Sequence, residues 1–92
     1  MTSTPYIRDV ISAEPRRLDS AVKAMLPPQL TARWSGNYRE PGNILMGDEI
    51  VGQYATDREF TYSGRAALDP QFQQKTGLNP DELLDRIAKV FG

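Results

Sequence analysis

The sequence predicts a small α+β domain, in which an antiparallel sheet of three to four strands is packed by an N-terminal and a C-terminal amphipathic helix. Residues 15–26 and 80–91 show the apolar spacing of helices, and the region between them alternates with a period of two and is punctuated by turn residues. The chain of 92 residues is long enough for one domain and too short for two. We therefore expect 1–92 to form a single domain, with 1–4 frayed.

The N-terminal part contains one ambiguous segment and one clear helix. The apolar residues of 5–11 fall at i, i+1, i+4 and i+5, which favours a short helix, and an edge strand fits the same residues. In 15–26, Pro15 suits the first turn of a helix, and Pro27 with Pro28 ends it. The apolar side of this helix contains Leu18, Ala21, Val22, Met25 and Leu26. Because it is amphipathic, we expect it to cover a sheet.

The middle of the chain predicts short strands joined by tight turns. The alternation of Leu30, Ala32 and Trp34 with polar residues is typical of a half-buried strand. Gly47 and Asp48 suit a two-residue hairpin turn with glycine at its first central position. The predicted strands are 30–34, 44–46, about 49–55 and about 59–65.

The register of these strands is predicted from the faces of their side chains, since a one-residue slip moves every side chain to the other face. The first turn sets Leu45 opposite Ile50 and Ile44 opposite Val51. For the next hairpin we expect a three-residue loop at 56–58. The resulting pairs are Tyr54 with Phe60 and Gly52 with Tyr62.

This register predicts a sheet with two unlike faces. One face gathers the apolar set Leu45, Ile50, Tyr54, Phe60 and Tyr62. The other face carries Ile44, Val51 and Ala55 among Gln53, Thr61, Ser63 and Arg65. That second mixture is less polar than a solvent face and less apolar than a core, which is typical of a surface that binds a partner. The alternative is that the first helix or the 69–77 segment covers it.

The C-terminal part has the strongest local helix signals. After Asp69, a short helix over 71–75 is expected to end at Gly77. Asn79 can cap the last helix, and Glu82 three residues later closes a capping box. The apolar arc of the last helix contains Leu83, Leu84, Ile87, Ala88, Val90 and Phe91.

The composition excludes several classes of function. The chain has no histidine and no cysteine, so it lacks an imidazole base, a thiolate nucleophile, a zinc finger and a disulfide. We therefore expect no catalysis, no cofactor and no bound transition metal. The net charge of −1 is spread evenly and argues against a generic nucleic-acid binder. With no apolar run long enough for a membrane span and no secretory signal, the expected compartment is the cytoplasm.

The remaining functional signal is a set of aromatic and arginine residues, the types that dominate hot spots of protein interfaces. The sequence thus predicts a non-catalytic protein-interaction module (a regulator, inhibitor or accessory subunit) that binds a partner protein through a loop-and-sheet patch. The predicted partner-binding residues are Tyr38, Arg39, Ile44, Val51 and Arg65. A homodimer is one form of this hypothesis. The alternatives are a single-stranded nucleic-acid binder that stacks bases on the sheet and, less favoured, a small enzyme that uses carboxylates.

Overall fold

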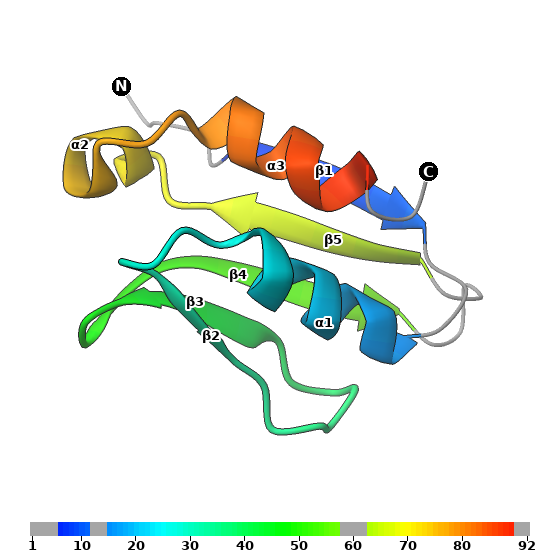
Figure 1. Ribbon diagram of the computed structural model, residues 1–92. Coiled ribbons are helices and arrows are strands. Elements are labelled where there is room, and N and C mark those ends of the chain that lie inside the picture. Colours follow the sequence, from blue (N-terminus) through cyan, green and yellow to red (C-terminus); the bar gives the residue numbers. More distant parts are fainter. Residues whose placement is uncertain (1–5, 12–14, 58–62, 90–92) are drawn as a thin grey trace.

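A computed structural model describes residues 6–11, 15–57 and 63–89 (Figure 1). These residues form an antiparallel sheet of five strands in the order β1-β5-β4-β3-β2, together with three helices. The α+β class is as predicted, and the sheet has five strands instead of three to four. The elements are β1 (Tyr6–Ile11), α1 (Pro15–Met25), β2 (Thr31–Arg33), β3 (Gly42–Met46), β4 (Glu49–Asp57), β5 (Ser63–Leu68), α2 (Phe72–Thr76) and α3 (Pro80–Lys89).

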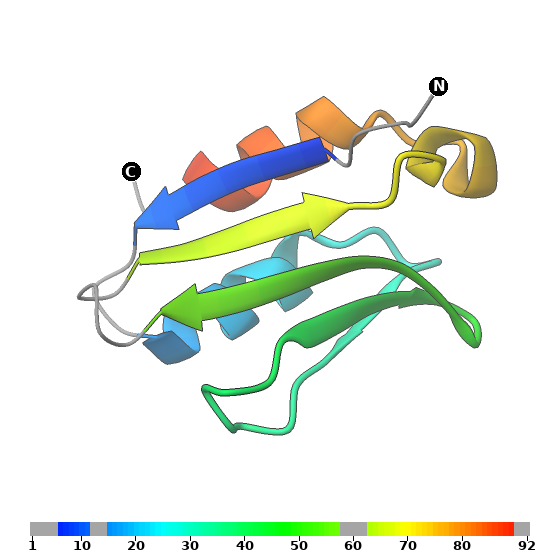
Figure 2. The same cartoon turned by 180° about the vertical axis from the view of Figure 1, so that it is seen from behind.

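The two long helices lie side by side on one face of the sheet. α3 packs over β1 and β5, while α1 packs over β2, β4 and β5 and touches α3 (Figure 1). Seen from behind, the strands lie in front of both helices (Figure 2). The core therefore lies between the helices and one face of the sheet. No helix in the described ranges combines the length and apolar character needed to cross a membrane.

β1 settles the ambiguity at the N-terminus in favour of the edge strand, so the preferred short helix was wrong. The strand pairs antiparallel with β5, and its side chains alternate between the core and the other side. Val10 is buried and Tyr6 packs against the core, whereas Ile7 is half exposed. The aromatic and β-branched residues of this segment favour a strand once β5 is available for pairing.

The turn between β3 and β4 matches the prediction, but the register beyond it contains a bulge. Gly47 has a φ of 65°, as its position in the turn requires, and Leu45 pairs with Ile50. The register then shifts, so that Ile44 pairs with Gly52 and not with Val51. As the extra residue of the bulge, Val51 turns into the core beside Gly52.

The predicted hairpin at 56–58 was wrong, because β4 continues to Asp57. Tyr54 pairs with Ala66 and Gly52 pairs with Leu68, which rules out the expected pairs with Phe60 and Tyr62, residues outside the described ranges. The longer strand places Ala66, Leu68 and Tyr54 together in the core beneath the helices. The burial of β5 therefore outweighs the local preference for a turn at Thr56. The predicted fraying of 1–4 also lies outside the described residues.

The helices follow their local signals closely. α1 begins at Pro15 and buries Leu18 and Val22 against the sheet. α2 ends at Gly77, which has the left-handed φ of 74° expected of a C-cap. At the start of α3, the backbone N–H of Glu82 donates a 3.1 Å hydrogen bond to Oδ1 of Asn79, which confirms the predicted cap. The residues that α3 buries are Pro80, Leu83, Leu84 and Ile87.

Candidate functional site

The sheet face turned away from α1 and α3, called here the open face, is the first candidate surface. The strand register places one row of side chains across five strands on this face: Ile7, Ala67, Gln53, Asn43 and Arg33. A second row contains Asp9, Arg65 and Ala55, and a third contains Ile50, Leu45 and Thr31. Neither long helix covers these rows (Figure 2).

The polar side chains of the open face are largely paired with one another. Nε of Arg65 lies 2.7 Å from Oδ1 of Asp9 across the β1–β5 pair, and the Gln53 amide donates a 3.3 Å hydrogen bond to Asn43. Two apolar side chains remain half exposed nearby, since Ile7 and Ile50 each keep 48% of their surface accessible. The face thus combines satisfied polar groups with uncovered apolar area, a composition found at protein interfaces.

The aromatic residues of the described strands lie on the helix side of the sheet. Tyr6 and Trp34 pack against the core, and Tyr54 belongs to it. The open face therefore presents no aromatic ring within the described ranges. The nucleic-acid alternative requires aromatic rings on which bases can stack, and the described residues of the open face provide none.

The loop between β2 and β3 is the second candidate surface, called here the Trp34 loop (34–41). The indole N–H of Trp34 donates to the backbone carbonyls of Asn37 and Glu40, both at 3.1 Å. The Tyr38 ring packs at a tilt against the indole, with 5.4 Å between the ring centroids. One aromatic side chain thus joins the start, tip and end of the loop.

Polar side chains fix the same loop from within. The Ser35 hydroxyl donates to Oε2 of Glu40 at 2.9 Å and accepts the Asn37 N–H at 3.2 Å. Oδ1 of Asn37 then accepts the backbone N–H of Arg39 at 3.0 Å. Because these bonds hold the backbone, the exposed guanidinium of Arg39 stands on an ordered support.

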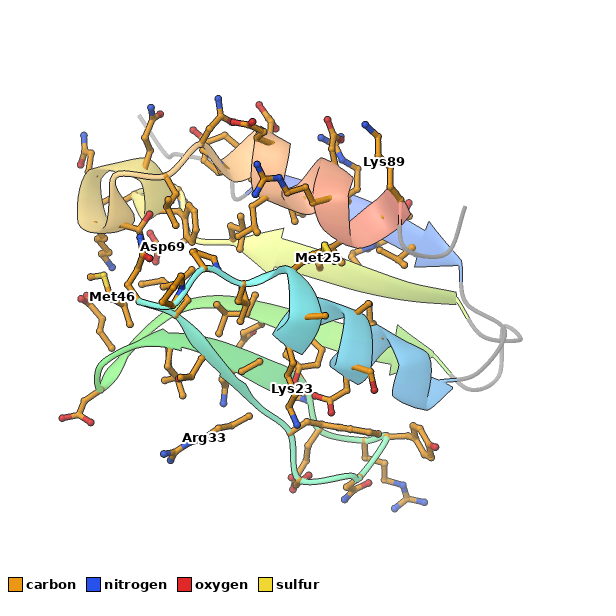
Figure 3. The ribbon with its side chains drawn as sticks, in the orientation of Figure 1. Lys23, Met25, Arg33, Met46, Asp69 and Lys89 are labelled. Atoms are coloured by element: carbon orange, nitrogen blue, oxygen red, sulfur yellow. The ribbon has the colours of Figure 1, made fainter. Side chains whose placement is uncertain are left out.

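An open pocket of about 500 Å³ lies between the Trp34 loop and α1. Its walls come from α1, both neighbouring strands and the loop: Lys23, Ala32, Arg33, Trp34, Ser35, Glu40, Pro41 and Asn43. Figure 3 shows Lys23 extending from α1 toward the loop and Arg33 projecting outward from β2. Lys23 is thus the cation that extends toward the loop, whereas the Arg33 side chain belongs to the open face and points away from Lys23.

The position of Lys23 depends on a buried tyrosine. The Tyr54 hydroxyl donates to Oδ1 of Asp19, and Nζ of Lys23 lies 3.1 Å from Oδ2 of the same carboxylate. Burial raises the pKa of Tyr54 above its ordinary value, and the hydrogen bond to the Asp19 carboxylate raises it further. The phenol therefore stays protonated at neutral pH, and its hydroxyl donates a hydrogen bond that fixes the Asp19 carboxylate.

Other carboxylates form ion pairs between elements. Asp81 and Asp85 of α3 lie 3.6 Å and 3.0 Å from the Arg8 guanidinium of β1. Lys75 of α2 lies 3.1 Å from Glu49, whose hydrogen bond is the main reason that the pKa of Lys75 is raised. No group of three or more potential metal ligands occurs in the part of the chain that the structure describes.

The structure separates the five predicted partner-binding residues. Half-buried Tyr38 and exposed Arg39 share the Trp34 loop, and exposed Arg65 lies on β5. Ile44 and Val51 are completely buried under the helices. Their predicted placement on a partner-binding face was wrong, because the bulge in β4 turns Val51 into the core and pairs Ile44 with a buried glycine.

Sequence reasoning did not single out the pocket residue Lys23 or the joining role of Trp34. The spacing of Asp19 and Lys23 is an i,i+4 signal for an ion pair, and it could have marked Lys23 as a fixed cation. The turn residues that follow Trp34 indicate a loop but not its hydrogen bonds to the indole. Comparisons with protein-family models, curated proteins and solved structures each gave no match.

Proposed function

We propose that this chain is a non-catalytic protein-interaction module, a regulator, inhibitor or accessory subunit that binds a partner protein through the open face and the adjoining Trp34 loop. The observation that carries this proposal is the pair of half-exposed isoleucines, Ile7 and Ile50, on a sheet face that neither long helix covers. Burial of such apolar area among satisfied polar groups favours association with another protein. We keep the cytoplasm as the proposed compartment, with which the cysteine-free composition agrees.

The ordered Trp34 loop supports the same proposal. Its hydrogen bonds fix the backbone that carries Arg39, so that binding would cost little conformational entropy at this loop. Arginine and tyrosine are enriched among the residues that dominate interface energies. The loop therefore has the side-chain chemistry and the rigidity of a contact surface.

The test compares two open-face variants with a matched variant on the helix side. The immobilised chain is used to capture partners from an extract of its native host, read by quantitative mass spectrometry. Ile7→Ser with Ile50→Ser should reduce capture of a specific protein by about tenfold, since each removes a half-exposed apolar side chain. Lys89→Ser, a change at an exposed position of α3, should capture as the unmodified chain does.

Three outcomes decide between this proposal and its alternatives. Equal capture by the open-face double variant and the unmodified chain contradicts the proposal. Concentration-dependent dimerisation in sedimentation, abolished by the same two changes, supports its homodimer form. Binding of a labelled single-stranded oligonucleotide with no protein partner favours the nucleic-acid alternative.

A further inference from the structure

We draw no further inference here: the strongest candidate, the apolar area around Ile7 and Ile50 on the open face of the sheet, belongs to the surface already described under the proposed function, and nothing in the structure shows which molecule covers it.

Discussion

Replacement of Gly42 by alanine should strongly destabilise the fold, because the Tyr54 ring lies directly over this glycine. The two residues are cross-strand partners in the β3–β4 pair. A Cβ built on Gly42 would lie 2.6 Å from each Cε carbon of the ring, whereas carbon atoms in contact normally stay about 3.5–4.0 Å apart. The ring must therefore move by about 1 Å or more.

The ring has little freedom to make that movement. Tyr54 is buried in the core, and its hydroxyl is bonded to Asp19 of α1. Overpacking a core costs about 1–3 kcal/mol, and breaking a hydrogen bond to a charged group adds about 1.5–3 kcal/mol. We expect Gly42→Ala to lower the free energy of unfolding by about 3–5 kcal/mol, a large part of the total for a domain of this size.

Urea unfolding followed by circular dichroism measures this loss, and a double-mutant cycle assigns its cause. In a Tyr54→Leu background the ring is gone, so Gly42→Ala should cost less than about 1 kcal/mol, because alanine itself suits a strand better than glycine. If the unfolding midpoint of Gly42→Ala equals that of the unmodified chain, the close approach does not exist. If the cost is the same in both backgrounds, the ring is not its source.

The remaining predictions concern α3 and the buried phenol. Leu84→Ala and Ile87→Ala each remove a fully buried side chain and should each cost about 2–5 kcal/mol in urea unfolding; unchanged melting would mean that α3 does not dock. Asn79→Ala removes the cap of α3 and should cost about 1 kcal/mol, with Asn79→Asp largely preserving stability. The pKa of Tyr54 is raised in the folded state, so the protonated phenol stabilises the fold relative to the unfolded chain. This contribution to the free energy of unfolding is complete below the unfolded pKa of about 10 and is lost progressively as the pH rises above it. Stability measured from pH 8 to 11 should therefore fall less in Tyr54→Phe than in the unmodified chain.

The parts of the fold that depend on nearby residues could be predicted from the sequence. The start of α3 depends on a local hydrogen bond between Asn79 and Glu82, three residues apart, and on no residue distant in the sequence. Gly77 likewise ends α2 through its own backbone conformation. The six residues of β1 were ambiguous because their apolar spacing favours a short helix and fits an edge strand almost as well, and pairing with β5 decides for the strand.

The register and the candidate site depend on contacts between distant residues. The bulge at Val51 places both it and Gly52 toward the core, where Leu68 of β5 covers the glycine. Alternation along β4 alone contains no sign of that extra residue. Similarly, Lys23 and Trp34 come to the same pocket from α1 and the end of β2. The sequence could indicate that Tyr38 and Arg39 lie in a loop, but not that the indole of Trp34 holds this loop in place.

The topology explains why one face of the sheet is open. α1 connects β1 to β2, which lie at opposite edges of the sheet, and it crosses the strands between them on one side. α3 packs on the same side, over β1 and β5, and buries the apolar side chains of Leu83, Leu84 and Ile87 there. α2 has five residues and buries Phe72 into the same core. Within the described ranges, every helix thus packs its apolar side chains against one face of the sheet, and none of them covers Ile7 or Ile50, which each keep 48% of their surface accessible on the other face.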